Sequence, residues 1–199
     1  MSNPASKAEQ RQTLRARRNA LSAQQQARAA EQLAARVANS SVFRSARRIA
    51  CYVPNDGEID TRPLMRRMWR MRRQCYLPVL SRLFYDRLWF APATPRSTFS
   101  RNRFGIPEPV AASRSWLRAE EIDLILVPLV GFDMNGNRLG MGGGFYDRSL
   151  GFLRDRSCWI RPKLLGLAHD FQRLEILEPS PWDIPLQGVA TDRALYLGM

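Results

Sequence analysis

Apolar and polar residues recur with two different periods along the chain, and the changes of period predict its elements. From about residue 4 to 20, and again from 22 to 37, apolar residues recur at helical spacing, and Ser22-Ala-Gln-Gln25 has the pattern of a capping box. In the second helix the predicted inward residues are Ala27, Ala30, Leu33, Ala34 and Val37. Short apolar, β-branched runs predict strands at 48–53, 74–79, 87–91, 124–130, 163–168, 189–191 and 194–197.

The order of these elements predicts an α/β fold. Between the first two strands, Thr61 is a candidate cap and Pro63 suits the first turn of a helix at 64–73, so residues 48–79 form a βαβ unit with parallel strands and a right-handed crossover. The run at 124–130 is apolar throughout, which is typical of a strand buried on both faces. Without a repeat or a linker, residues 1–199 are predicted to form one domain, with residues 1–38 as helices packed on it.

A glycine-rich segment follows this central strand and an Asn-Gly turn. It reads Arg138-Leu-Gly-Met-Gly-Gly-Gly144 and leads into a short predicted helix at 145–153. Strand, glycine loop and helix N-terminus is an arrangement that binds phosphate. The segment matches neither G-x-x-x-x-G-K-[ST] nor G-x-G-x-x-G, because position 145 is Phe. The alternative is a tight βα turn whose glycines only permit close packing. Arg138 and Asp147 favour the phosphate hypothesis, since one could pair with phosphate and the other could hold a divalent cation.

Two further segments have both a functional and a structural interpretation. Lys7, Arg11, Arg15 and Arg18 form a basic stripe at helical spacing, which is either a solvated face or a surface laid over phosphates. Glu58 lies in a loop at the carboxyl end of the first strand, where α/β proteins bind ligands. It would either touch substrate or only favour the dipole of the next helix.

Two later segments are equally open. Phe104 lies among prolines in the long irregular stretch after residue 91, which suits either the wall of a pocket for a flat ring or a structural crossover. Asp183, between Trp182 and Ile184, is either a turn former or a second carboxylate near a metal.

Composition narrows the classes of function. The chain has 199 residues, 45% of them hydrophobic, and a net charge of +13 carried mostly by dispersed arginines. This charge permits a basic nucleic-acid- or ribosome-associated protein, although no helix-turn-helix, RNP or zinc-finger pattern accompanies it, so nucleic acid is not the expected partner. One histidine, His169, and the widely spaced Cys51, Cys75 and Cys158 argue against zinc and against Ser/His or Cys/His catalysis. No apolar run approaches the ~20 residues of a membrane span, and the N-terminus has no signal-like apolar core, so a cytoplasmic location is expected.

The central segment closely resembles the signature of the 5-formyltetrahydrofolate cyclo-ligase family, also called methenyltetrahydrofolate synthetases. The matching residues are Asp123-Leu-Ile-Leu-Val-Pro…Gly131-Phe-Asp…Gly136-Asn-Arg-Leu-Gly-x-Gly-x-Gly-Phe-Tyr-Asp147. Weaker matches cover nearly the whole chain: the basic pair Lys7 and Arg11, a substrate loop at 55–61, a pterin-side segment at 105–109, and C-terminal residues Gln172, Asp183 and Thr191.

The resemblance implies a reaction, a fold and a set of site residues. The reaction is ATP- and Mg²⁺-dependent cyclisation of 5-formyltetrahydrofolate to 5,10-methenyltetrahydrofolate with release of ADP and phosphate. The fold is a three-layer α/β sandwich with a mainly parallel sheet, similar to ribose-5-phosphate isomerase and coenzyme A transferases. A folate, free or polyglutamylated, is the implied substrate of a monomer or weak oligomer.

The implied ATP-binding residues are Lys7, Arg11, Arg138, Leu139, Gly140, Met141, Gly142, Gly143, Gly144, Phe145 and Tyr146. The implied substrate-binding residues are Val53, Glu58, Phe104, Gly105, Ile106 and Pro107. The implied catalytic residues are Glu58, Arg138 and Tyr146, and the implied metal ligands are Asp147 and Asp183.

The sequence departs from the family pattern at three positions. Many members carry basic residues at positions 141 and 143, where this chain has Met141 and Gly143. Position 182 is often His but is Trp182 here, which leaves the metal role of Asp183 less secure. An ATP-dependent enzyme acting on another anionic small molecule therefore stays open as an alternative, because a fold does not determine a substrate.

Overall fold

The computed structural model describes residues 6–81, 87–154 and 161–198, and Cys158 lies outside them. Its central sheet has the strand order β11-β10-β9-β6-β1-β2-β3. In chain order the strands are β1 (Arg48–Ala50), β2 (Gln74–Leu80), β3 (Leu88–Pro92), β6 (Leu124–Pro128), β9 (Lys163–Ala168), β10 (Gly188–Thr191) and β11 (Leu195–Leu197). The five strands from β10 to β2 run parallel, while β3 and β11 pair antiparallel at the two edges. The predicted α/β class and mainly parallel sheet are thus confirmed.

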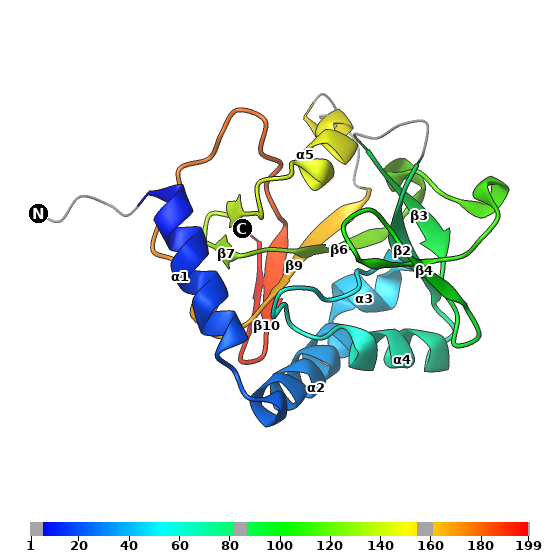
Figure 1. The fold of residues 1–199 in the computed structure, drawn as a ribbon, viewed down its shortest axis with the longest axis horizontal. Helices are drawn as coiled ribbons and strands as arrows, with labels where there is room; N and C mark the ends of the chain where they lie inside the picture. The colour runs from blue at the N-terminus through cyan, green and yellow to red at the C-terminus, as the bar shows by residue number, and fades with distance from the viewer. Residues whose placement is uncertain (1–5, 82–86, 155–160, 199) are drawn as a thin grey trace, which may run out of the picture.

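Helices lie on both sides of this sheet (Figure 1). The helices are α1 (Lys7–Asn19), α2 (Ala23–Asn39), α3 (Ser41–Ser45), α4 (Arg62–Arg70) and α5 (Phe145–Ser149). Short 3-10 turns are η1 (Ser113–Ser115), η2 (Ala119–Glu121), η3 (Gly151–Leu153) and η4 (Asp170–Gln172). Two small antiparallel sheets complete the described residues, β4 (Phe99–Arg101) with β5 (Pro107–Pro109) and β7 (Gly131–Phe132) with β8 (Arg138–Leu139).

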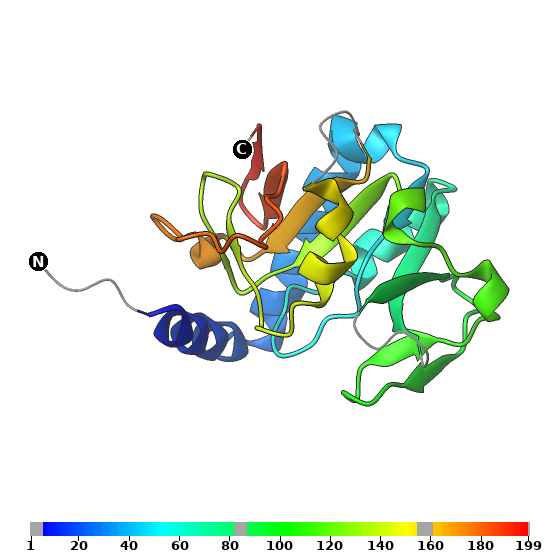
Figure 2. The ribbon, with the colours of Figure 1, turned by 90° about the horizontal axis from the view of Figure 1, so that it is seen from above.

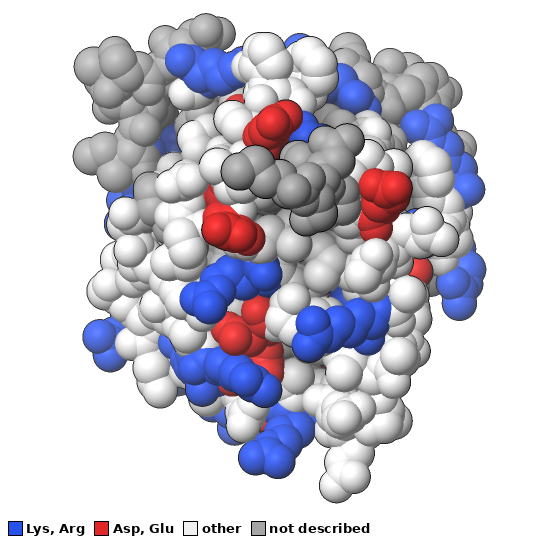
Figure 3. Space-filling model, turned by 90° about the vertical axis from the view of Figure 1, so that its left-hand side faces the viewer, with Lys and Arg blue, Asp and Glu red and all other residues white. Residues whose placement is uncertain are grey.

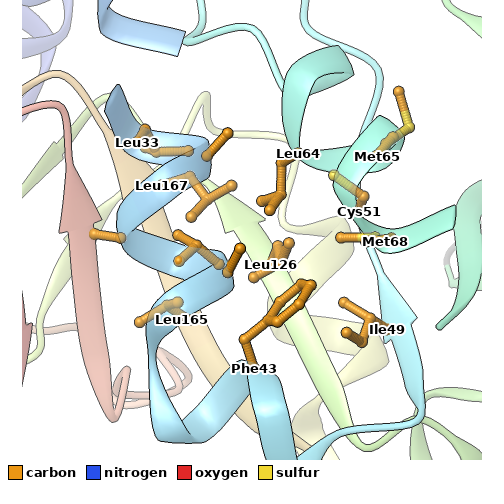
Figure 4. Close-up of a cluster of buried hydrophobic side chains, with 14 of the residues drawn as sticks. Leu33, Phe43, Ile49, Cys51, Leu64, Met65, Met68, Leu126, Leu165 and Leu167 are labelled. Carbon is orange, nitrogen blue, oxygen red and sulfur yellow. The ribbon is translucent and has the colours of Figure 1, made fainter. Parts of the chain in front are cut away.

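The central strand β6 is buried on both faces, as its sequence predicts. Leu124 and Leu126 join the cluster under α2, α3 and α4, which Figure 4 shows with Leu33 and Leu64 pointing at the sheet. The alternate residues of β6 join a second cluster on the opposite face, which is covered by η2, by the end of α5 and by residues 184–186. Because successive strand residues point to opposite faces, a continuous apolar run is the signature of a strand with a layer on each side.

Most predicted elements occur, with local differences. The Ser22–Gln25 capping box starts α2, and Ala30, Leu33, Ala34 and Val37 are buried, but the prediction that Ala27 points inward was wrong because it is exposed. The predicted helix at 64–73 is α4, with Pro63 in its first turn. Thr61 holds the cap position without a capping hydrogen bond, since its hydroxyl donates to the Tyr52 carbonyl at 2.6 Å.

Two predictions near the candidate site need correction. The helix expected at 145–153 is split into the five-residue α5 and the 3-10 turn η3. The stretch after β3 was expected to be irregular but contains the β4–β5 hairpin, with Gly105 at φ +74° in its turn. In Figure 2 this hairpin stands at the right and α1 at the lower left.

Charge is distributed over the surface rather than confined to one segment. On the face that carries α1, basic side chains surround a few acidic ones (Figure 3). Among the helices of the described ranges, none has the length and apolar character needed to cross a bilayer.

Candidate active site

Arg18 joins α1 to the loop that follows β1. Its side chain is fully buried, and its Nη2 donates to both the backbone oxygen and the carboxylate of Asp56, at 2.6 and 2.8 Å. Its Nη1 donates to the Leu129 carbonyl just beyond β6, at 3.3 Å. Arg15 adds a second contact to the Asp56 carboxylate, at 2.7 Å. The basic stripe of α1 is therefore not a solvated face at Arg18: it ties the helix to the carboxyl edge of the sheet.

The loop after β1 bends sharply where it meets α1. Asp56 and Gly57 both have positive φ, and a Cβ on Gly57 would lie 2.6 Å from the Asn19 side chain. Only glycine suits a position with both positive φ and so close a neighbour. The bend places Glu58 at the end of the loop, where its carboxylate accepts the Asn55 N–H at 3.1 Å.

Glu58 and Tyr146 lie within electrostatic reach of each other. Burial raises the pKa of the Glu58 carboxyl to about 7, opposed in part by the Asn55 hydrogen bond and by Arg18. Burial also raises the pKa of Tyr146 well above its ordinary value, and the Glu58 charge adds to that increase. The site therefore holds a carboxyl group that exchanges its proton near neutrality beside a phenol that stays protonated. Both Cys51 and Cys75 are buried, and burial raises the pKa of Cys51 to about 12, so these thiols are inert.

Residues 138–144, called the glycine loop below, are shaped by backbone conformation. Gly142 and Gly144 have φ of +97° and +65°. A Cβ on Gly140 or Gly142 would meet nothing within 4 Å, so the alternative that these glycines only permit close packing is wrong for both positions. The loop is held from outside by Arg11, whose Nε donates to the Gly140 carbonyl at 2.8 Å. Because α5 has only five residues, its dipole is short. Phosphate binding at this loop would therefore depend mainly on backbone N–H groups of the loop itself.

Arg138, a candidate partner of phosphate, and Asp147, a candidate metal ligand, form an ion pair with each other. Arg138 donates to Asp147 Oδ1 and to the Ile184 carbonyl, and its side chain is only 5% exposed. This pairing fixes the Asp147 carboxylate at the wall of the glycine loop.

Asp183 is a turn former, as one of its two interpretations predicts, and it also faces the candidate site. Its carboxylate accepts the Ser180 N–H at 2.8 Å, which makes it a turn former, and it also lines the same pocket as Asp147. Across the described ranges, no three His, Cys, Asp or Glu residues are grouped to hold a metal. Two carboxylates at one wall fit Mg²⁺ that arrives bound to a nucleotide, because Mg²⁺ takes one or two carboxylates together with substrate phosphates.

The β4–β5 hairpin forms the wall opposite α1. Glu108 accepts from the Leu80 backbone N–H at 3.0 Å and from the Asn102 amide at 2.7 Å, which fastens the hairpin to the end of β2. Phe104, 53% exposed, extends from the turn and meets Phe145 edge-on with ring centroids 5.8 Å apart. The hairpin tip and the glycine loop thus share one aromatic contact.

These elements enclose one pocket of about 610 Å³, called the glycine-loop pocket below. It contains every site residue predicted from the sequence except Gly105, which sets the hairpin turn beside it. Its size is that of a small-molecule site. Gln172 and Thr191 lie elsewhere and are buried: Gln172 donates to the Leu129 and Val130 carbonyls, and Thr191 donates to Asp170. Those two residues support the fold rather than line the pocket.

The sequence did not reveal how several residues support or line this site. Arg18 was visible only as one cation in a helical stripe, and nothing local indicates that it is buried. Asn102 and Glu108 carried no signal beyond their place among prolines. Trp182 lines the pocket with 61% of its surface exposed, beside Asp183 and Ser180. Ser180 accepts a hydrogen bond from Lys7 at 3.1 Å, so the 179–185 turn also contacts α1.

Comparisons with known proteins all match this chain to the same family. The model of the 5-formyltetrahydrofolate cyclo-ligase family matches residues 3–192. The 5-formyltetrahydrofolate cyclo-ligase of Escherichia coli K12 is 40% identical over 185 residues, covering 92% of this chain and 98% of that protein. The Haemophilus influenzae protein of the same name is 40% identical over 166 residues, covering 83% of this chain and 87% of its own.

A solved structure agrees in fold. The NMR structure of Aquifex aeolicus 5,10-methenyltetrahydrofolate synthetase has a TM-score of 0.80 and 29% identity, covering 96% of this chain and 92% of that one.

Proposed function

The chain belongs to the 5-formyltetrahydrofolate cyclo-ligase family, and from this premise we propose that it converts 5-formyltetrahydrofolate to 5,10-methenyltetrahydrofolate. The proposed reaction uses ATP and Mg²⁺ and releases ADP and phosphate. The observation that carries the proposal is that the glycine loop, the basic residues Lys7 and Arg11, Glu58 and Phe104 all line one pocket.

The proposed chemistry proceeds in two steps. First the formyl oxygen attacks the γ-phosphorus of ATP, the bond to the β-phosphate oxygen breaks, and ADP leaves. Then N10 bonds to the formyl carbon and loses its proton, the carbon–oxygen bond breaks, and phosphate leaves with that oxygen. Phosphorylation is needed because oxygen would otherwise have to leave as hydroxide. Phosphoryl transfer requires positioning and charge neutralisation more than a strong base.

The nucleotide side of the pocket supplies that neutralisation. Glycine-loop backbone N–H groups, Lys7 and Arg11 are proposed to bind the triphosphate, and Phe145, which separates the loop from the hairpin, is proposed to mark the boundary with the folate. Asp147, fixed by Arg138, is proposed to hold Mg²⁺ with help from Asp183. Bound Mg²⁺ would neutralise charge on the phosphate oxygens.

The substrate side provides a proton acceptor and an apolar wall. Glu58, with a pKa near 7, is proposed to take the N10 proton, and Tyr146, which stays protonated, is proposed to donate a hydrogen bond to the formyl or phosphate oxygen. Val53, Ile106, Pro107 and Phe104 are proposed to hold the pterin ring, with Gly105 shaping the turn that presents them.

Met141 and Gly143 remove two cations that many family members carry in the glycine loop. Arg11 already contacts the Gly140 carbonyl, which supports α1 as the compensating source of positive charge. Trp182 replaces a histidine beside Asp183 and leaves that wall of the pocket without a titratable side chain at that position.

The test mixes purified protein with 5-formyltetrahydrofolate and MgATP in neutral buffer and follows the absorbance of the methenyl product. We expect product to form only with ATP and Mg²⁺ present, and Asp147→Asn to abolish it while the variant remains folded by circular dichroism. A flat trace from folded wild-type protein that still binds ATP would overturn the proposed substrate. Salt-dependent RNA binding without any response to folate would instead favour a nucleic-acid-associated role.

A further inference from the structure

A second pocket lies behind α1, and its lining shares no described residue with the glycine-loop pocket. It has a volume of about 630 Å³ and lies between the end of α1, the outer face of α2 and the loops that follow β9 and β10. We call it the arginine pocket. Its polar and charged wall includes Arg17, Arg28, Arg36, His169, Asp192 and Arg193.

Among the described residues that line this pocket, positive charge exceeds negative charge. Four arginines face one carboxylate, and none of the ion pairs between described residues involves these arginines. Arg36 donates to the Asp192 backbone carbonyl, and Arg17 lies over the Phe171 ring with its guanidinium carbon 4.3 Å from the centroid. The arginine side chains around this pocket repel one another, and an anion bound among them would be attracted by each one.

His169 gives this pocket a buried ring nitrogen that has no hydrogen-bond partner among the described residues. The side chain is 2% exposed, stacks on Phe171 with ring centroids 5.3 Å apart, and its Nε2 has no hydrogen-bond partner among the described residues. Burial lowers the pKa of His169 to about 4, so the ring is neutral at pH 7. An unpaired buried nitrogen costs free energy unless something outside the protein meets it.

We propose that the arginine pocket is a binding site for a compact anion that carries two or more phosphate or carboxylate groups. Planar guanidinium groups match both oxyanions with paired hydrogen bonds. The binding does not depend on which reaction the other pocket performs.

Isothermal titration calorimetry of the full chain, at constant ionic strength set with chloride, tests the proposal with pyrophosphate and citrate as probes. Because pyrophosphate would also bind the proposed nucleotide site, we expect saturable binding of at least one probe at one site per chain besides the glycine-loop pocket. Preference for pyrophosphate would assign phosphate chemistry to the site, and preference for citrate would assign carboxylate chemistry. Arg28→Gln combined with Arg193→Gln should weaken that binding by about tenfold or more, because each removes charge-assisted hydrogen bonds.

Two double variants serve as controls, one for the overall charge of the protein and one for binding at the glycine-loop pocket. Arg70→Gln combined with Arg114→Gln makes the same charge change at exposed positions that line neither pocket, and should leave affinity unchanged. Lys7→Gln combined with Arg11→Gln alters only the glycine-loop pocket, so it should remove any pyrophosphate binding there and leave the affinity of the arginine pocket unchanged. Equal weakening in the first control, loss of all binding in the second, or no saturable binding by wild type would each overturn the proposal.

The single histidine provides a direct spectroscopic readout. We expect the ¹⁵N resonances of His169 to shift on saturation with the probe and its pKa to rise, because a bound anion favours the imidazolium form. Unchanged His169 resonances at saturation would place the anion elsewhere and overturn the assignment.

Discussion

The Glu58 carboxyl is partly buried at the wall of the glycine-loop pocket, and burial raises its pKa from 4.5 to about 7. The folded protein therefore binds this proton more tightly than the unfolded chain does. Stability contributed by the protonated carboxyl is complete below pH 4.5 and is lost as pH rises to about 7. The proposed catalytic role requires the opposite state, the carboxylate, so activity and stability should respond to pH in opposite directions.

The Glu58→Gln variant tests whether stability and activity depend on pH in opposite directions. Above pH 7 the variant should be more stable than wild type by up to roughly 3 kcal/mol, because each pKa unit corresponds to about 1.4 kcal/mol. The difference should vanish below pH 4.5, as measured by urea unfolding across pH. At saturating MgATP, the activity of wild type is expected to rise through pH 7, and the variant should lose both this rise and most of its turnover. Unchanged turnover with a retained pH profile would remove Glu58 from the reaction.

Gly140→Ala is a probe of how close the nucleotide approaches the loop. Gly140 lies outside the left-handed region, and its added methyl group meets nothing within 4 Å, so unfolding free energy should change by less than about 0.5 kcal/mol. If phosphate lies against the loop backbone, the KM for ATP should rise severalfold. Gly144→Ala, at φ +65°, should by contrast lose about 1 kcal/mol. An unaltered KM in Gly140→Ala would place the triphosphate away from this wall.

At the scale of elements, α1 is held to the sheet by Arg18 more than by its exposed arginines. Arg18→Met removes charge-assisted hydrogen bonds to Asp56 and Leu129 and should lower the unfolding free energy by about 2–3 kcal/mol. Arg15→Met removes another contact to the same carboxylate from a side chain that is 45% exposed, and should cost under about 1 kcal/mol.

The Arg18 variant should also raise the KM for ATP, because α1 carries Lys7 and Arg11 into the glycine-loop pocket. Urea unfolding and steady-state kinetics of the two variants check both effects. Equal destabilisation by the two substitutions would show that burial of Arg18 adds nothing to its contact with Asp56.

Elements defined by their own residues could be predicted from the sequence, whereas those defined by distant contacts could not. The apolar run of β6 and the capping box of α2 determine those elements locally. The β4–β5 hairpin was missed because all three residues of β4 are exposed and β5 reads Pro-Glu-Pro, so neither strand alternates in polarity. What holds it is the carboxylate of Glu108 on Leu80, a contact 28 positions away in sequence. The burial of Arg18 has the same character, since its partner Leu129 is 111 positions away.

At the scale of the whole molecule, a long signature that resembles a known family named in advance residues that line one pocket, while their geometry could not be predicted. The ion pair between Arg138 and Asp147 joins two candidate residues whose contact the sequence did not reveal. The arginine pocket was equally invisible, because its cations come from α1, α2 and the loop after β10. In the sequence they are a few among many dispersed arginines, and only the fold gathers them around His169.

Net charge should affect stability and nucleotide binding in opposite ways. At +13 the folded chain repels itself, and salt screens that repulsion as the Debye length falls from about 10 Å at 0.1 M to about 3 Å at 1 M. Raising NaCl over this range should therefore raise the melting temperature. The same screening weakens attraction between the basic pocket wall and an anionic nucleotide, so the KM for MgATP should rise while kcat changes little.

Chloride is the appropriate anion for this experiment, since phosphate or sulfate would also occupy the arginine pocket. Differential scanning calorimetry and steady-state kinetics in the same buffers measure both quantities. A melting temperature that falls with salt would mean that surface ion pairs such as Arg62–Asp60 outweigh the net repulsion. That result would contradict the view that the excess of arginine lowers the stability of the folded protein until bound anions neutralise it.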